Sequence, residues 1–232
     1  KTNFSTGHWL KLAIKKIHEI RVRNKIPILV GGTGLYFNSL VNGLVKIPNI
    51  PIKFRNKIRS LHKKLGSKNF FSELVKLDPL VKNQIKSSDT QRCIRAYEVK
   101  LFTNNSIYNW FKNTQSKYEQ KDFYKIYIDY PRNELLNRIN LRVKKMIEKG
   151  AIPEVRKFVK LKVQKDKTAC KAIGISEVRE YLIKKIDIND VIENISIKTR
   201  QYAKRQSTWA RGNMQNWNKM NPIKLKNFLK KI

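Results

Sequence analysis

The sequence is poor in acidic residues. Of its 232 residues only 17 are Asp or Glu, against 51 Lys or Arg, and the formal net charge is +34. A positive excess of this size favours a polyanion as partner, and nucleic acid is the class we expect. An exposed lysine surface that meets only solvent would give the same composition. With so few carboxylates, the pattern identifies no general base.

Cysteines and long apolar runs are also scarce. Cys93 and Cys170 lie far apart and the three histidines are scattered, so neither a zinc site nor a disulfide scaffold is expected. The cysteine usage favours a reducing compartment, and we expect a cytoplasmic one. No apolar run reaches the ~18 residues of a membrane span, so we expect no membrane partner. Because the chain begins with Lys1 rather than Met, we expect it to start inside a longer protein or to have been processed.

The apolar pattern predicts an α/β core interrupted by helices. Ile28-Leu29-Val30 is a short apolar run typical of a buried parallel strand, and residues 123–129 alternate as a strand does. Two strands do not make a stable sheet, so further sheet-forming sequence is expected before residue 1. Helical spacing is found in several segments, at about residues 9–23, 90–102, 132–149, 151–161, 174–184 and 188–212.

The same pattern predicts the organisation of the chain. An α/β core is expected at residues 1–47 and 122–212, with a basic helical insertion at 48–121 and a basic tail at 213–232. The tail shows no clear element, and Trp217 is its only obvious anchor.

Gly31-Gly32-Thr33-Gly34 follows the predicted strand and precedes a helical pattern. Glycines there let a backbone approach a ligand, and a helix N-terminus favours an anion. A tight turn would need glycine for its own reasons, so both interpretations stay open. The segment is not a Walker A loop, because no Gly-Lys-[Ser/Thr] occurs in the sequence.

Three basic patterns could bind phosphate, and each has a plain alternative as a solvated face. Gln91, Arg92 and Arg95 follow Asp89 or Thr90, either of which can cap a helix. Arg138 and Arg142 are four residues apart, and two guanidiniums on one helix face repel unless they share an anion such as a diphosphate. Residues 199–211 are dense in cations and amides, and Trp209 among them is expected to pack in the core.

Taken together, these segments resemble the tRNA dimethylallyltransferase (isopentenyl-tRNA transferase) family. The resemblance spans about residues 4–217. It is carried by the following blocks, in this order: Pro27-Ile28-Leu29-Val30-Gly31-Gly32-Thr33-Gly34-Leu35-Tyr36, Asp89-Thr90-Gln91-Arg92-x-x-Arg95-Ala96-x-Glu98-Val99, Arg138-x-x-x-Arg142-x-x-x-Met146-x-x-x-Gly150, Ala172-Ile173-Gly174, and Thr199-Arg200-Gln201-x-Ala203-Lys204-Arg205-Gln206-x-Thr208-Trp209-x-Arg211.

The resemblance implies a P-loop-kinase-like parallel sheet, here without its N-terminal strands, and a mostly helical insertion that grips the anticodon stem-loop of tRNA. It implies transfer of a dimethylallyl group from dimethylallyl diphosphate to N6 of the adenosine 3′ of the anticodon, with Mg²⁺ on the diphosphate. The base leaves the stack to react. A monomer is expected.

The resemblance also implies roles for individual residues. Thr33 is expected beside the reacting adenosine, where it is our only catalytic candidate, and Arg142 and Arg138 on the diphosphate side. The residues implied to contact tRNA are Thr33, Arg55, Gln91, Arg92, Cys93, Ile94, Arg95, Lys171, Ala172, Ile173 and Gly174.

The family's Walker-like loop and the Asp-Ser-x-Gln segment that holds its general base do not occur in these 232 residues. We therefore expect this chain to be incomplete as a catalyst and a separate N-terminal P-loop fragment to be a further partner. The alternative hypothesis is an inactive, truncated or split remnant that only binds RNA. A kinase or NTPase is disfavoured because the Walker lysine is missing.

Overall fold

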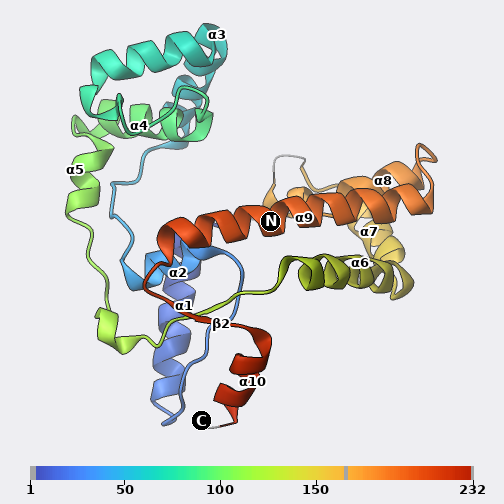
Figure 1. The fold of residues 1–232 in the computed structure, drawn as a ribbon. Helices are drawn as coiled ribbons and strands as arrows, with labels where there is room; N and C mark the ends of the chain where they lie inside the picture. The colour runs from blue at the N-terminus through green and yellow to red at the C-terminus, as the bar shows by residue number, and fades with distance from the viewer. Residues whose placement is uncertain (1–3, 165–166, 231–232) are drawn as a thin grey trace. The chain divides into compact units, whose positions relative to one another are not determined.

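The computed structural model describes residues 4–164 and 167–230, and it is mostly helical with one small parallel sheet (Figure 1). The chain divides into two compact units: unit 1 is Lys1–Asn38 with Lys121–Ile232, and unit 2 is Ser39–Gln120. The elements, in chain order, are α1 (Thr6–Arg21), α2 (Gly34–Val41), α3 (Ile52–Leu77), η1 (Pro79–Val81), α4 (Thr90–Thr103), α5 (Ile107–Lys112), η2 (Gln120–Asp122), β1 (Ile126–Ile128), α6 (Arg132–Glu148), α7 (Ala151–Lys160), η3 (Thr168–Lys171), α8 (Ile175–Leu182), α9 (Ile188–Asn213), β2 (Asn218–Met220) and α10 (Pro222–Leu229).

Unit 2 is built on the packing of α3 against α4. Helix α3 is interrupted at Gly66, whose φ of 73° is outside the helical region. Asp89 caps the N-terminus of α4, because its side-chain oxygen accepts a hydrogen bond from the N–H of Arg92 at 3.1 Å. The core between the two helices contains Phe70 and Leu74 from α3 with Cys93, Ala96 and Val99 from α4.

Unit 1 has its apolar core among α6, α7, α8 and α9. Helix α9 lies alongside both α6 and α8, as Figure 1 shows. The buried side chains that form this core are Ile139, Val143, Val155, Val178, Val191 and Ile195. Within α6 and α9 these residues are four apart, Ile139 with Val143 and Val191 with Ile195, which is the helical spacing that the sequence pattern shows.

The helices predicted from the pattern are confirmed, with ends that shift by a few residues, as α1, α4 and α6 to α9. The strand predicted at residues 123–129 is confirmed as the shorter β1. In the part of the chain that the structure describes, no helix combines the length and apolarity needed to cross a membrane.

The strand predicted at residues 28–30 was wrong for this structure. Residues 27–31 have no regular secondary structure, and Val30 is 87% exposed. A strand forms only where a neighbour accepts its backbone hydrogen bonds, and no described strand lies beside this run. The partner of β1 is instead β2, parallel and in register from Ile126 opposite Asn218 to Ile128 opposite Met220. The sequence pattern gave no sign of β2 or of α10 after it.

Candidate functional site

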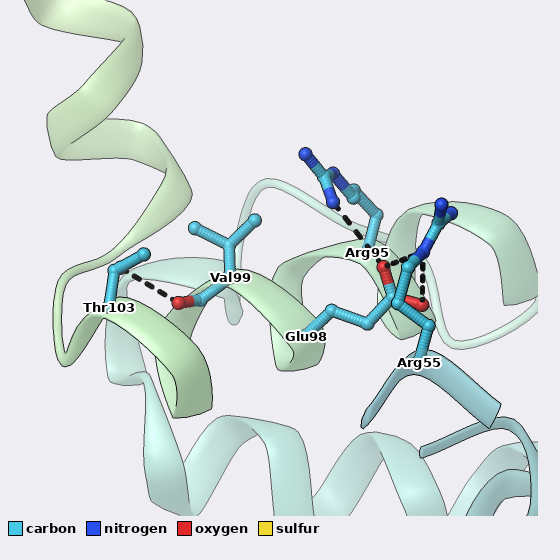
Figure 2. A network of polar contacts seen from close by, with 5 residues as sticks. All are labelled: Arg55, Arg95, Glu98, Val99 and Thr103. Atoms are coloured by element: carbon cyan, nitrogen blue, oxygen red, sulfur yellow. Dashed lines mark hydrogen bonds and ion pairs between the residues drawn. The ribbon is translucent and has the colours of Figure 1, made fainter. Parts of the chain in front are cut away.

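One polar cluster of unit 2 joins two arginines to one buried carboxylate (Figure 2). The Glu98 side chain on α4 is 1% exposed, and its two oxygens accept from Nε of Arg55 on α3 at 3.3 and 3.2 Å. Nη1 of Arg95, one turn earlier on α4, donates to Oε2 of Glu98 at 3.4 Å. The packing of α3 on α4 thus brings together two arginines that lie far apart in the sequence, and arginine is well suited to bind phosphate.

The other candidates near the start of α4 point in different directions. Gln91 and Arg92 are exposed, and Arg92 pairs with Asp89 at 3.4 Å. The Cys93 side chain is 1% exposed in the core, and Ile94 packs partly against the same core. Burial, followed by the charge of Asp89, raises the pKa of the Cys93 thiol, which therefore stays protonated. Contact of Cys93 and Ile94 with tRNA stays a prediction that their placement does not support.

In unit 1, the glycine segment before α2 packs directly on α9. The side-chain amide of Gln206 donates to the carbonyl of Gly32 at 2.9 Å. A Cβ atom added to Gly32 would come within 3.0 Å of that amide nitrogen, and one added to Gly34 would come within 3.0 Å of three atoms of the Trp209 indole. Close packing therefore requires glycine at position 34, whereas a side chain at position 32 would meet the flexible end of Gln206. Trp209, expected in the core, is half-buried against this segment.

Thr33 lines an apolar and aromatic cavity of about 510 Å³ in unit 1. The rings of Trp9 and Tyr36 are stacked in its wall, with centroids 4.7 Å apart. The remaining lining residues are Leu12, Ala13, Lys16, Leu29, Val30, Gly31, Gly32 and Phe37. A cavity with stacked rings and an apolar lining suits a flat or apolar group. Its one lysine, Lys16, already pairs with Glu19 at 2.6 Å.

Arg138 and Arg142 lie on the exposed face of α6, along a shallow groove of about 470 Å³. Lys145 and Lys149 continue the same face. The guanidinium of Arg138 lies over the ring of Tyr130, 5.0 Å from its centroid. Among the residues that the structure describes, neither arginine has a carboxylate within 4.0 Å, so this face keeps its positive charge.

The segment Lys171 to Gly174 is positioned by the buried carboxylate of Glu177, which pairs with a half-exposed lysine. Gly174 adopts φ 105°, a conformation that favours glycine, and its N–H donates to Glu177 at 2.8 Å. Glu177 is buried and pairs with Lys198 of α9. Burial raises the pKa of the Glu177 carboxyl, but hydrogen bonds from Lys198, the backbone and Ser176 outweigh it, so the pKa lies below its usual value. Lys171 and Ala172 are exposed, whereas Ile173 packs against the core of unit 1.

Magnesium would need oxygen ligands. Over the described ranges 4–164 and 167–230, no three His, Cys, Asp or Glu side chains gather in a geometry that could hold an ion. Arg138 and Arg142 cannot serve, because guanidinium has no lone pair to offer. We therefore assign no Mg²⁺ ligand and derive no step through a metal.

Sequence reasoning gave no role to Glu98, Glu177, Trp9 or Tyr36. The i, i+3 spacing of Arg95 and Glu98 was a usable signal, since such pairs meet on one helix face. The contact of Glu98 with Arg55, and the stacking of Trp9 on Tyr36, depend on tertiary packing and leave no mark in the sequence.

Comparison with known proteins gives a consistent result. The IPP transferase family pattern matches residues 1–213. The chain is 56% identical over 229 residues to a tRNA dimethylallyltransferase of Pelagibacter ubique, covering 99% of this chain and 73% of that protein. Among solved structures it is similar to the full-length tRNA isopentenylpyrophosphate transferase of Bacillus halodurans, with TM-score 0.60 and 30% identity over 95% of this chain and 68% of that one.

A eukaryotic dimethylallyltransferase, captured in crystals while acting on tRNA, is also similar. Its TM-score is 0.77 at 25% identity, over 95% of this chain and 57% of that protein. The chain thus spans between 57% and 73% of the length of these three relatives.

Proposed function

This chain belongs to the IPP transferase family, and from that premise we propose that it acts in the dimethylallylation of tRNA. The observation that carries the proposal is the 56% identity over nearly the whole chain to a tRNA dimethylallyltransferase. The proposed substrates are dimethylallyl diphosphate and a tRNA whose adenosine lies 3′ of the anticodon.

The proposed reaction is a substitution at carbon. The N6 nitrogen of adenosine forms a bond to C1 of the dimethylallyl group, the bond from C1 to the diphosphate oxygen breaks, and N6 loses one proton. A proton acceptor and stabilisation of the leaving diphosphate are both required. We assign the second task in part to Arg142 and Arg138, whose exposed charges on α6 support it.

We assign the adenosine to the cavity that Thr33 lines. Its stacked Trp9 and Tyr36 rings and its apolar lining support a planar base there. Thr33 is a weak base, so we propose that it orients the adenosine by hydrogen bonding and does not accept the proton. We assign the role of proton acceptor for N6 to none of the residues named here.

We assign the anticodon stem to unit 2. Arg55 and Arg95 around Glu98, with the exposed Gln91 and Arg92, support contacts to the phosphate backbone. We also infer that unit 1 is part of a P-loop-kinase-like parallel sheet in the working enzyme. The exposed apolar side chains of Ile28 and Val30, which a neighbouring strand and helix would cover, support that inference.

A chimera tests the proposal. These residues would replace the matching segment of the Pelagibacter ubique relative, and transfer of labelled dimethylallyl groups to unmodified tRNA would be measured beside the parent protein. We expect transfer by the chimera at a rate comparable to that of its parent. A folded chimera that binds tRNA but transfers nothing would favour the RNA-binding remnant, and one that does neither would overturn both hypotheses.

A further inference from the structure

We propose that Glu98 is a positioning residue that holds Arg55 and Arg95 together as one site for a single phosphodiester of the RNA backbone. The inference rests on the proposed function and deepens it, because it names the chemical group that this part of unit 2 takes. Three features of the cluster carry it: the unused donors, the charge balance and the arrangement on the helices.

The first feature is the number of donors left over. A guanidinium carries five N–H groups in a rigid fork. Arg55 gives only Nε to Glu98, and Arg95 gives only Nη1. Within the described ranges 4–164 and 167–230, neither guanidinium makes another hydrogen bond to protein. The side chains are 37% and 38% exposed, and Figure 2 shows the remaining nitrogens of Arg55 pointing away from Glu98. These donors are therefore accessible to a ligand.

The second feature is the charge. Two guanidiniums on one carboxylate leave a net charge of +1, which one phosphodiester neutralises. The carboxylate also relieves the repulsion between the two arginines, so that both can face the same anion. A diphosphate carries more negative charge than the cluster offers, so the RNA backbone fits this site better than the prenyl donor does.

The third feature separates this site from an ordinary ion pair between helices. Glu98 and Arg55 alone would join α4 to α3, and burying a carboxylate is costly unless it is well paired. Arg95 lies on the same helix as Glu98, three residues before it, and adds nothing to the joining of α3 and α4. The hydrogen bond from Arg95 to the Glu98 carboxylate fixes the orientation of the Arg95 guanidinium beside that of Arg55.

The test measures binding of the whole chain to an anticodon stem-loop RNA over a range of salt concentrations. Glu98→Gln keeps the size of the side chain but raises the net charge by one. Long-range electrostatics alone therefore predicts tighter binding to a polyanion, whereas a positioning role predicts a loss of about tenfold. Glu73→Gln is the matched control, since Glu73 is an exposed acid of α3 paired with Lys76. It should leave binding unchanged or slightly tighter.

The arginines test whether one phosphate is bound. Arg55→Ala, Arg95→Ala and the double variant should each lower the salt dependence by the same single step, roughly 0.7–0.9 in the slope of log affinity against log salt. A double variant that loses twice as much contacts two phosphates and overturns the single-site inference. Glu98→Gln in the double variant should have no further weakening effect.

Folding and function have separate controls. Circular dichroism and the melting temperature show whether each variant is folded. If Glu98→Gln does not fold, Arg55→Lys replaces it, because lysine keeps the charge but not the fork and should weaken binding about tenfold. Wild-type chain that does not prefer the stem-loop over an unrelated RNA of equal length would contradict the proposed function. The inference alone would be overturned if the wild-type chain binds the stem-loop and Glu98→Gln binds it equally or more tightly. Unchanged binding by Arg55→Lys would overturn it in the same way.

Discussion

Replacing Gly34 by alanine should destabilise unit 1, although alanine is the better helix former. At an open site, Gly→Ala in a helix stabilises by up to about 1 kcal/mol. Gly34 is the first residue of α2, and an added Cβ would come within 3.0 Å of Cε3, Cζ3 and Cη2 of Trp209. Carbon atoms normally approach to about 3.5–4.0 Å, so the rigid indole or the helix must move. Overpacking of this kind costs about 1–3 kcal/mol. This cost exceeds the stabilisation that alanine would give as the better helix former.

Thermal and denaturant unfolding of the purified chain would measure the effect. We expect Gly34→Ala to lower the free energy of unfolding by about 1–2 kcal/mol and the melting temperature by about 3–6 °C. Gly212→Ala is the matched control, because Gly212 lies in α9 and an added Cβ there meets no atom within 4 Å. That variant should be neutral or slightly stabilised.

A double-variant cycle identifies the cause. In a Trp209→Ala background, Gly34→Ala should lose its cost, giving a coupling free energy of about 2 kcal/mol. Gly32→Ala should lower the free energy of unfolding by less than Gly34→Ala does, because its added Cβ meets the flexible end of Gln206, which can move aside. The cost is then the hydrogen bond from Gln206 to the Gly32 carbonyl. Equal stabilisation by Gly34→Ala and Gly212→Ala would refute the reasoning.

Four further predictions concern charge. Lys198→Met should destabilise unit 1 by about 2 kcal/mol, since it leaves the buried Glu177 carboxylate unpaired while Lys198 itself is half exposed. The pKa of Glu177 is lowered by folding, so its contribution to stability is complete above its unfolded value and is lost as pH falls through its folded value. Glu177→Gln should therefore unfold with a weaker dependence on acid than wild type, and an identical acid transition would count against this. Arg142→Ala in the active chimera should raise KM for dimethylallyl diphosphate about tenfold and lower turnover, with tRNA affinity unchanged. Lys144→Ala is the control, because Lys144 lies outside the groove, and it should change neither KM nor turnover. Finally, affinity of the chain for the stem-loop should fall linearly on a log–log salt plot, and a flat titration would contradict a phosphate interface.

The sequence predicted the helices well because each buries an apolar stripe, and α1, α4 and α9 also begin at a capping side chain. Asp89 is an example, since it is one of the two caps that the pattern allowed and the one that α4 uses. Strand pairing was harder to predict. Asn218-Lys219-Met220 is too short and too polar to show an alternation, and it forms β2 only because β1 lies beside it. The apolar run at residues 28–30 looks like a strand but has no neighbour to pair with in this structure.

The same limit applies to the candidate site. The pattern around residue 91 identified Arg95, and the resemblance identified Arg55, but neither indicated that the two share one carboxylate. That contact requires α3 and α4 to pack with these faces together, which depends on the whole core of unit 2. Local spacing predicts which residues share a helix face, and only tertiary structure decides what that face meets.

The placement of the few acids separates two explanations of the large positive charge. A drift in composition toward lysine would add cations where a charge costs little, on the solvated surface, and would leave the interior apolar. Among the described residues, the buried charged side chains are Asp78, Glu98 and Glu177, all acidic. Glu98 lies beneath two partly exposed arginines, and Glu177 fixes the turn that follows Lys171. A buried carboxylate has a desolvation cost that drift alone does not explain, and these two lie beneath segments expected to contact tRNA. The charge of this chain is therefore organised at these two places, and it is there that neutralising an acid should weaken RNA binding instead of strengthening it.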